Sequence, residues 1–248
     1  MKGKIIVIGL GEVGRPLMEI ISQGYDDVVG LDLEPVEFHG KCDVMHICFP
    51  FQISDFVGEC ITYINKYQPR LTVINSTVAP GTTRAVFDKT GMSIAYSPVR
   101  GKHVRMKQEL LHYAKFVGGI DTESSQRAAE HFQSVGMKTK ILSSPEAVEL
   151  AKLTETTYFG LLIAWAQEVE RYCDQLSLNY DEIVSFYDEI GYLPPVRFFP
   201  GVIGGHCVMS NVGILKSVCN SKILDAIEKS NDLKKKEQPI YRLYTGGC

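Results

Sequence analysis

The sequence predicts an α/β fold in which a doubly wound parallel sheet is followed by an all-helical domain. Short apolar runs alternate with helical segments up to residue 143, as expected for parallel strands joined by crossover helices. Beyond that residue a helical pattern continues for some thirty positions. A glycine-rich turn directly after the first strand is the third observation. We therefore expect an α/β domain at 1–143, a helical domain at 144–230 and a C-terminal tail at 231–248.

Strands are expected where β-branched and other apolar residues form a short run between turn residues. Such runs occupy 4–8, 28–32, 44–50, 71–77, 92–98, 114–120 and 138–143. Runs of this kind are typical of strands that are buried in a parallel sheet. Helical spacing of apolar residues is found between them at 15–24, 53–67 and 122–135.

The second domain is predicted to be built on one long helix. Ser144 is a good N-cap, Pro145 fits the first turn, and Glu146 suits its positive end. Apolar residues then recur at helical spacing from Ala147 to Val169. So long and apolar a helix is expected to pack against several partners, including a second subunit, which predicts a homodimer. Shorter helices are expected at 181–191 and 212–220.

The composition is that of an ordinary soluble globular protein. The 248 residues are 45% hydrophobic and 22% charged, with a formal net charge of −3, which gives no reason to expect nucleic acid or a membrane as partner. The basic run LKKKE at 233–237 is short and mixed with acids, so a solvated tail is expected there. No stretch approaches the ~18 apolar residues of a membrane span, and Glu12 interrupts the run that superficially resembles a signal peptide.

The seven cysteines stand at scattered positions without a CxxC pair. An odd number without regular spacing does not make a disulfide framework, and no tight cluster of His and Cys indicates a structural zinc site. We therefore expect a cytoplasmic protein with reduced thiols and no bound metal.

The turn GLGEVG at 9–14 follows a strand and opens a helix, which is the setting of a Rossmann-type dinucleotide-binding unit. Gly9 permits the tight turn, Gly11 lets the backbone approach a pyrophosphate, and Gly14 lets helix and strand pack closely. The helix N-terminus offers N–H groups to the anion. Asp32, at the end of the second strand, is placed to accept hydrogen bonds from the adenosine ribose, which favours NAD over NADP. A structural turn without a cofactor is the other interpretation.

Three further motifs accompany this turn: NSTVAPGTT at 75–83, AVELAKL at 147–153 and GGHC at 204–207. In this order and at this spacing, the chain resembles the nucleotide-sugar 6-dehydrogenases, the UDP-glucose/GDP-mannose dehydrogenase family. The resemblance runs from residue 1 to about residue 215. It implies an NAD-binding domain, a helical domain that commonly forms a dimer interface, and a two-step NAD-dependent oxidation of a sugar C6 alcohol to a carboxylate.

The resemblance also implies roles for individual residues. Cys207 corresponds to the nucleophile, which adds to the aldehyde of the first step and leads to a thioester that water cleaves. The two adjacent glycines before it leave such a thiol approachable. Lys152 corresponds to the lysine whose ammonium stabilises the oxyanion, and Thr77 to the residue beside the nicotinamide. Each of these residues has an alternative interpretation: Cys207 as an ordinary loop cysteine, Lys152 as a solvated lysine on a helix, and Thr77 as a β-branched residue at the end of a strand.

The predicted cofactor-binding residues are Gly9, Gly11, Glu12, Val13, Gly14, Asp32, Pro50, Ser76 and Thr77. The predicted catalytic residues are Cys207, Lys152, Asn211 and Thr156. The last two are departures from the family's pattern. Thr156 stands in place of an asparagine, and Asn211 stands in place of an aspartate that is assigned to base or water-activating work. An amide cannot accept a proton, so general-base catalysis at that position is lost.

Two further departures concern the substrate side. The segment SPVRGKHVRM at 97–106 lacks the acid that the family assigns to thioester hydrolysis and offers Arg100, Lys102, His103 and Arg105 instead. This basic run either contacts a phosphorylated substrate or is a solvated loop. We expect the C-terminal domain that holds the nucleotide in the family to be lacking. His206 and His103 are candidates for a substitute base, because histidine titrates near neutral pH.

The sequence therefore leaves two functions open. The favoured one is an NAD-dependent oxidoreductase that oxidises an alcohol of a sugar or sugar derivative, because both Cys207 and Lys152 are retained. The alternative is a catalytically degenerate NAD-binding protein with a structural or regulatory role, which Asn211, Thr156 and the missing domain favour.

Overall fold

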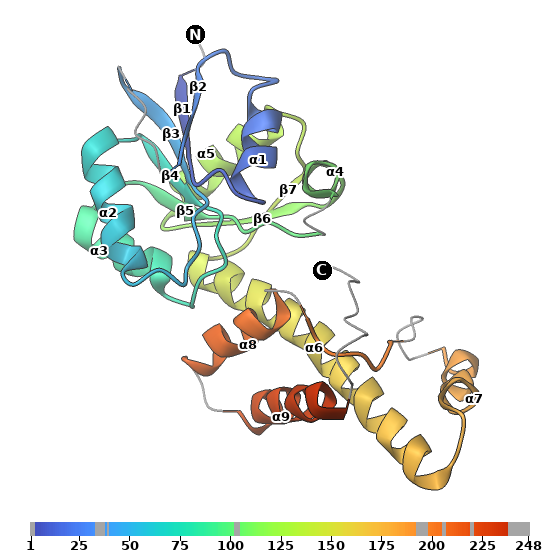
Figure 1. Cartoon of the computed structure of the whole chain (residues 1–248). Coiled ribbons are helices and arrows are strands. Elements are labelled where there is room, and N and C mark those ends of the chain that lie inside the picture. The colour runs from blue at the N-terminus through green and yellow to red at the C-terminus, as the bar shows by residue number, and fades with distance from the viewer. Residues whose placement is uncertain are drawn as a thin grey trace. The chain divides into compact units, whose positions relative to one another are not determined.

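The computed structural model describes residues 3–32, 38, 40–101, 105–191, 198–204, 207–218 and 221–237 (Figure 1). The chain divides into two compact units, Met1–Lys152 and Leu153–Cys248, and each unit is described by itself. Within the described residues, no helix is both long enough and apolar enough to cross a membrane.

The first unit contains a seven-stranded sheet in the order β2-β1-β3-β4-β5-β6-β7. The strands are β1 (Lys4–Ile8), β2 (Val28–Leu31), β3 (Cys42–Ile47), β4 (Leu71–Ile74), β5 (Ile94–Tyr96), β6 (Lys115–Gly119) and β7 (Thr139–Ile141). Neighbouring strands are parallel except for β5 and β6, which are antiparallel. The predicted doubly wound α/β fold is confirmed, and the sheet is mostly parallel; β6 and β7 run opposite to the other strands.

The reversal at β6 follows from the connection that precedes it. A parallel strand requires a crossover that carries the chain back to the opposite edge of the sheet. Among its described residues, the segment after β5 contains the seven-residue helix α4 (Met106–His112), and the chain enters β6 from the edge at which β5 ends.

Helices cover both faces of this sheet: α1 (Gly14–Ile21), α2 (Phe56–Tyr67), α3 (Thr82–Thr90), α4 and α5 (Thr122–Gln133). Ile5 and Val7 of β1 belong to one core with residues of α1, α4 and α5. Ile6 and Ile8 belong to a second core with residues of α2 and α3. Because successive side chains of a strand point to opposite faces, a strand covered on both sides must be apolar throughout.

Two helices of this unit, α3 and α4, are absent from the sequence-based prediction. The buried residues of α3 are Thr82, Thr83 and Val86, so its apolar pattern is weak. Helix α4 is too short to show a clear period. The predicted helix 53–67 begins only at Phe56, because the carboxylate of Asp55 caps it by accepting from the N–H of Gly58 at 2.8 Å.

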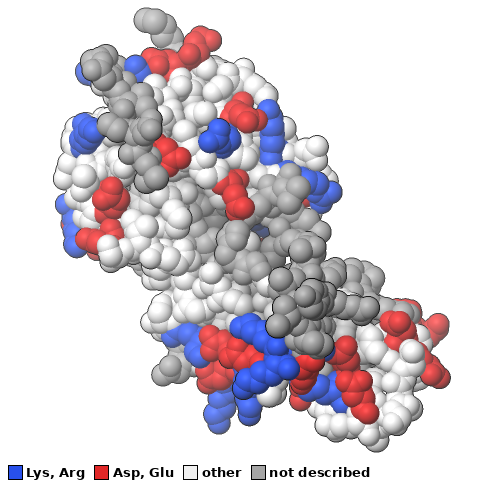
Figure 2. All heavy atoms as spheres, in the orientation of Figure 1, with Lys and Arg blue, Asp and Glu red and all other residues white. Residues whose placement is uncertain are grey.

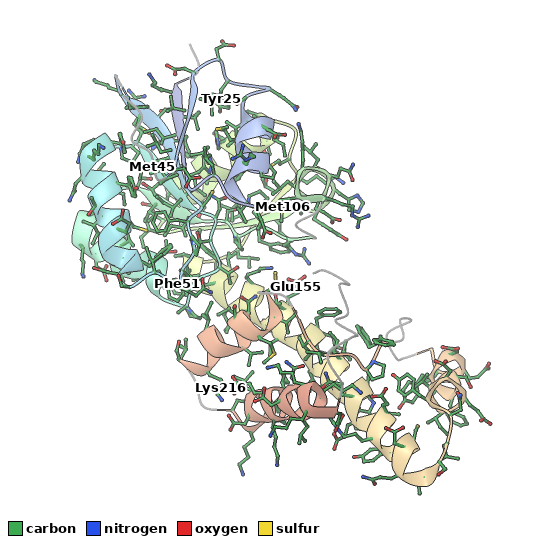
Figure 3. The ribbon with its side chains drawn as sticks, viewed as in Figure 1. Tyr25, Met45, Phe51, Met106, Glu155 and Lys216 are labelled. Carbon is green, nitrogen blue, oxygen red and sulfur yellow. The ribbon has the colours of Figure 1, made fainter. Side chains whose placement is uncertain are left out.

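A chain of buried polar side chains crosses the first core. Lys115 Nζ donates to Asn75 Oδ1 at 3.4 Å, and Asn75 Nδ2 lies 3.2 Å from His46 Nδ1. His46 Nε2 lies 2.9 Å from His131 Nε2, and His131 Nδ1 lies 3.0 Å from the hydroxyl of Tyr25, which Figure 3 labels. The Asn75 amide nitrogen can only donate, so Nδ1 of His46 accepts. Each imidazole then donates to the next group when both are neutral.

If either histidine bound a second proton, the new N–H would point at an N–H group of its neighbour in the chain. The pKa values of both histidines are lowered, as this geometry requires. Burial, assisted by the charge of Lys115, lowers the pKa of His131 to about 4. Burial also lowers the pKa of His46 well below its usual value, with smaller contributions from His131 and Lys115. The first unit therefore folds around two neutral imidazoles.

The second unit consists of helices: α6 (Pro145–Leu176), which begins in the first unit, α7 (Tyr180–Ser185), the 3₁₀ helix η2 (Phe186–Glu189), α8 (Val208–Lys216) and α9 (Lys222–Glu237). The prediction of one long helix that begins at Pro145 is confirmed. The predicted helix 181–191 is divided into α7 and η2, and the one predicted at 212–220 begins earlier, at Val208. Gly160 lets α6 approach α8, because a Cβ there would lie 2.7 Å from Val208 Cγ1.

The basic run at 233–237 is part of α9 and not of a solvated tail. Lys234 is buried and forms an ion pair with Glu170 of α6. Lys216 Nζ of α8 similarly lies 2.8 Å from Asp225 Oδ1 of α9. Figure 2 shows basic and acidic side chains interleaved on one face of the molecule. The remainder of the expected tail, residues 238–248, lies outside the described residues.

The neutral histidine pair predicts a specific dependence of stability on pH. Because the pKa of His131 is about 4 when folded and near 6.5 when unfolded, the unfolded chain binds more protons between these values. The free energy of unfolding should therefore rise with pH from 4 to 6.5, by about 1.4 kcal/mol per pH unit for each such histidine. Urea denaturation across this range measures the slope.

His131→Gln should reduce that slope, whereas His112→Gln, at an exposed histidine of α4, should leave it unchanged. Equal slopes in wild type and His131→Gln would show that the buried pair does not govern acid stability.

Candidate functional site

The glycine-rich turn joins β1 to α1 and has little room for side chains at two of its three glycines. Gly9 has a φ of +89°, and a Cβ on it would lie 2.7 Å from Phe49 N. A Cβ on Gly14 would lie 1.8 Å from the carbonyl oxygen of Gly9. Gly11, by contrast, faces open space, with nothing within 4 Å of its Cβ position. The turn is thus closed towards the sheet and open on the side where a phosphate would approach.

Four strands end near this turn, at the carboxyl edge of the sheet. The strand order β2-β1-β3 reverses direction between β1 and β3, which is the switch point where α/β sheets bind ligands. Asp32 follows β2 and is exposed, and exposed Pro50 follows β3 in the loop that leads to Phe51 (Figure 3). Ser76, after β4, donates its hydroxyl to the carbonyl of Phe49 at 2.6 Å.

Half-buried Thr77 follows Ser76 directly, so the structure brings the motif after β4 to the same edge as the glycine turn. Glu12 is exposed and Val13 half-buried, where α1 begins. The N-cap residue of α1, Val13, makes no side-chain cap, and the first turn of the helix carries no acid. Both features suit an anion at this helix N-terminus.

Lys115 lies beneath this edge and was not identified in the sequence. Its ammonium donates to the carbonyl oxygens of Ser97 at 2.9 Å and Pro98 at 3.3 Å, in addition to Asn75. Burial lowers the pKa of Lys115 to about 7; nearby Cys48 opposes this shift and the charge of Lys152 adds to it. Its signal in the sequence is a lysine that opens an otherwise apolar strand.

The charge of Lys152 contributes to the lowered pKa of Lys115. Lys152 is half-buried on α6 and is the last residue of the first unit. Thr156, also half-buried, lies four residues later on the same helix face, and Figure 3 labels Glu155 beside it. The expected pair of Lys152 and Thr156 is therefore presented by one surface of α6.

Cys207 and Asn211 belong to the second unit and come together on α8. Half-buried Cys207 is the N-cap residue of this helix, and the N–H of buried Asn211 donates to the Cys207 carbonyl at 3.1 Å. Two buried amides hold the segment before the cysteine. Gln167 Nε2 donates to Gly201 O at 2.7 Å, and Asn231 Oδ1 accepts from the N–H of Ile203 at 2.7 Å.

Burial suppresses the reactivity of Cys42, Cys48 and Cys60. Cys42, Cys48, Cys60, Cys173 and Cys207 carry no disulfide. Burial raises the pKa of Cys42 and of Cys48 to about 12, and it raises the pKa of Cys60 further. A thiol at the N-terminus of a helix is in the opposite situation, because the helix dipole favours the thiolate.

Several residues of the predicted site lie outside the described residues, namely Lys102, His103, Gly205 and His206. The two candidate substitute bases, His103 and His206, are among them. Of the basic run, Arg100 stacks over Tyr113 and Phe116 at 5.6 and 5.4 Å, and Arg105 pairs with Glu109 at 2.8 Å. In the described part of the chain, no group of three or more His, Cys, Asp or Glu residues is placed to hold a metal ion.

Comparison with known proteins adds evidence that the geometry alone does not provide. The sequence model of the UDP-glucose/GDP-mannose dehydrogenase family, central domain, matches residues 146–233. The chain is 26% identical to the UDP-N-acetyl-D-mannosamine dehydrogenase of Methanocaldococcus jannaschii, over 92% of this chain. It is 26% identical to the enzyme of the same name from Pyrococcus horikoshii, over 83% of this chain. The chain spans 65% of the length of the first of these relatives and 52% of the second.

Solved structures show the same fold. The UDP-D-ManNAc dehydrogenase of Pyrococcus horikoshii matches with a TM-score of 0.78 at 21% identity, over 94% of this chain and 68% of that chain. The 3-hydroxyisobutyrate dehydrogenase of Mycobacterium tuberculosis matches with a TM-score of 0.73 at 18% identity, over 96% of this chain and 94% of that chain.

The glycine turn, the motif after β4, the lysine of α6 and the cysteine of α8 occur in the order expected from the resemblance. The sequence matches extend over more than nine-tenths of the chain. The part of this chain at residues 146–233 matches the central domain of the UDP-glucose/GDP-mannose dehydrogenase family, and the whole chain is similar to UDP-N-acetyl-D-mannosamine dehydrogenases.

Proposed function

We propose that this protein is an NAD-dependent oxidoreductase that oxidises an alcohol group of a sugar or nucleotide sugar. The observation that carries the proposal is the glycine turn at the switch point between β1 and β3. It packs tightly against the sheet through Gly9 and Gly14 and is open at Gly11. This shape suits a pyrophosphate bound to backbone N–H groups.

The residues of the first unit that would hold NAD are those at the carboxyl edge of the sheet. Gly9, Gly11, Glu12, Val13 and Gly14 would surround the pyrophosphate, and exposed Asp32 would accept hydrogen bonds from the adenosine ribose. Pro50, Ser76 and Thr77 would line the nicotinamide side. Bound NAD would supply a hydride acceptor, which no side chain of the chain provides.

Cys207 and Lys152 would carry the chemistry of the protein itself. The Cys207 sulfur would attack the carbonyl carbon of an aldehyde, and the carbonyl oxygen would gain negative charge as the C–S bond forms. The Lys152 ammonium would stabilise that oxyanion, a contribution that is typically worth 10²–10³-fold in rate. The position of Cys207 at the start of α8 favours the thiolate that this attack requires.

The substrate class is taken from the relatives, whose names specify UDP-N-acetyl-D-mannosamine. A nucleotide sugar is therefore the first candidate, and a smaller sugar derivative is the second. The location is proposed to be cytoplasmic. We also propose a homodimer through α6, because Tyr158, Leu161, Trp165 and Tyr172 expose apolar surface at helical spacing along that helix.

A second candidate function is that of a catalytically degenerate NAD-binding protein with a structural or regulatory role. The observation that favours it is Asn211, which stands where the family has an aspartate and is buried one turn after Cys207. Its amide cannot act as a base. Thr156 is the second departure near the proposed site.

Turnover separates the two candidates. Purified protein should reduce NAD in the presence of one member of a panel of nucleotide sugars, sugar phosphates and simple sugars, followed by the absorbance of NADH. Cys207→Ala should abolish formation of the carboxylate product, because no nucleophile remains to form the thioester. Cys173→Ala, at a buried cysteine of α6 in the same unit, should retain it. Absence of substrate-dependent turnover in the wild type would leave the degenerate protein as the better description.

Cofactor preference tests the role of Asp32. Asp32→Ala should weaken NAD binding by about tenfold, equivalent to 1.4 kcal/mol, and affect NADP binding much less, because a 2′-phosphate gains nothing from this carboxylate. Asp26→Ala is the matched control, since Asp26 is an exposed acid that precedes the same strand at its opposite end. Titration calorimetry gives both affinities, and equal losses for NAD and NADP would contradict the assignment.

Thiol labelling tests the activation of Cys207 without a substrate. At neutral pH we expect Cys207 to react at least ~10-fold faster than Cys48, because burial raises the pKa of Cys48 to about 12 whereas a helix N-terminus favours a thiolate. Equal labelling rates, measured by mass spectrometry of tryptic peptides, would rule out an activated thiol.

A further inference from the structure

Glu149 is a completely buried acid on α6 that lies within the AVELAKL motif but has no role in the proposed chemistry. It lies in the first two turns of the helix, within the first unit, and its carboxylate reaches across to the start of α3. Burial of a carboxylate is costly unless donors surround it. The contacts of Glu149 show how this cost is met.

Three hydrogen bonds from one short segment converge on the Glu149 carboxylate. The N–H of Gly81 donates to Oε2 at 2.7 Å. The N–H of Thr83 donates to Oε1 at 2.9 Å, and the Thr83 hydroxyl donates to the same oxygen at 2.6 Å. Helix α3 begins with Gly81 as its N-cap residue, in a left-handed conformation and without a side-chain cap of its own. Glu149 therefore supplies from α6 the cap that α3 lacks, at the end where the helix dipole favours an anion.

The loop capped in this way is the one that carries Ser76 and Thr77. It leaves β4 after Ile74 and is anchored at its start, where Ser76 donates to the carbonyl of Phe49 at 2.6 Å. Glu149 anchors its other end, at Gly81 and Thr83. Both ends of the loop are thus held by hydrogen bonds.

Lys152 follows Glu149 by three residues on α6, so the two side chains share one face of the helix. A helix segment is rigid over one turn, and a constraint on residue 149 is therefore a constraint on residue 152. The carboxylate of Glu149 links the two elements that carry Thr77 and Lys152.

We propose, on the basis of the function proposed above, that Glu149 is a positioning residue that holds Lys152 in register with the loop of Ser76 and Thr77. In this role Glu149 does not touch the reacting atoms. Its hydrogen bonds to Gly81 and Thr83 set the distance between the oxyanion-stabilising ammonium and the nicotinamide side of the site. Misplacement of such a group by about 1 Å can cost 10²-fold in rate.

The same two helices are joined by a second acid, which provides a matched control. Arg84 Nε of α3 donates to Glu146 Oε1 at 2.9 Å, one turn before Glu149 on α6. This pair is partly exposed, with 41% and 34% of the two side chains accessible, and exposed ion pairs contribute little to stability. Glu146→Gln therefore changes the same residue type on the same helix, at a contact with the same partner helix, but leaves the hydrogen bonds of Glu149 intact.

The kinetic test compares Glu149→Gln with Glu146→Gln in the full-length protein. In Glu149→Gln an amide nitrogen replaces one carboxylate oxygen and cannot accept a hydrogen bond. We expect kcat to fall about 10²-fold with KM for NAD within threefold, because orientation and not cofactor binding is lost. Glu146→Gln should retain wild-type kcat. If kcat per folded molecule is unchanged in Glu149→Gln, Glu149 only caps α3 and the positioning role is wrong.

Thr83→Val is a milder variant that still tests the proposal if Glu149→Gln does not fold. Thr83→Val keeps the shape of the side chain and both backbone donors and removes only the hydroxyl that donates at 2.6 Å. We expect an intermediate fall in kcat, about tenfold. A wild-type kcat in Thr83→Val together with a lowered urea midpoint would oppose the proposal.

A measurement that does not need turnover tests this proposal independently of the proposed function. The rate of Lys152 acetylation, mapped by mass spectrometry, should rise at least ~3-fold in Glu149→Gln and stay at the wild-type value in Glu146→Gln, because only the former releases the half-buried lysine. Lys89, near the end of α3, serves as the internal reference. An unchanged rate would overturn the positioning role even if the protein proves to be an active dehydrogenase. If the rate of Lys152 acetylation rises in a protein that shows no turnover, the positioning role of Glu149 is supported and only the proposed enzymatic function is refuted.

Discussion

The close approach of α1 to the sheet at Gly9 and Gly14 is the constraint on which the first unit depends. A Cβ at Gly14 would lie 1.8 Å from the Gly9 carbonyl oxygen, and a Cβ at Gly9 would lie 2.7 Å from Phe49 N. No other residue fits at either place without moving α1 or the end of β3. With both glycines present, the carboxyl ends of β1 and β3 and the start of α1 meet at one point.

Buried polar groups organise the rest of this edge. Lys115, Asn75 and the two histidines form a connected chain, while Glu149 is satisfied separately by Gly81 and Thr83. Such groups are costly to bury and are tolerated only when each donor meets an acceptor. Because their hydrogen bonds are directional, they define the position of the loop after β4 more narrowly than apolar packing would. A dehydrogenase needs a defined position there, since hydride transfer depends on orientation.

The likeness to a family and the function of this chain are separate questions. The fold is shared with structures as different as a UDP-D-ManNAc dehydrogenase and a 3-hydroxyisobutyrate dehydrogenase. A fold of this kind supports several reactions, and the residues of the site decide between them. The chain has the cysteine and the lysine that the proposed chemistry requires, but Asn211 has the wrong functional group for a base. The position of Asn211, one turn after Cys207 on α8, makes it the residue to examine first if oxidation stops at an aldehyde.

The sequence by itself determined the elements whose pattern is local. The apolar strands, the glycine turn, the long helix from Pro145 and the motif residues were all predictable, because short-range periodicity and turn chemistry specify them. Only the tertiary structure decided the rest. It reversed β6, added α3 and α4, placed Lys234 in a buried ion pair, and joined Glu149 to Thr83 and Lys115 to Asn75. These features depend on which distant residues meet when the helices close over the sheet, and no local pattern carries that information.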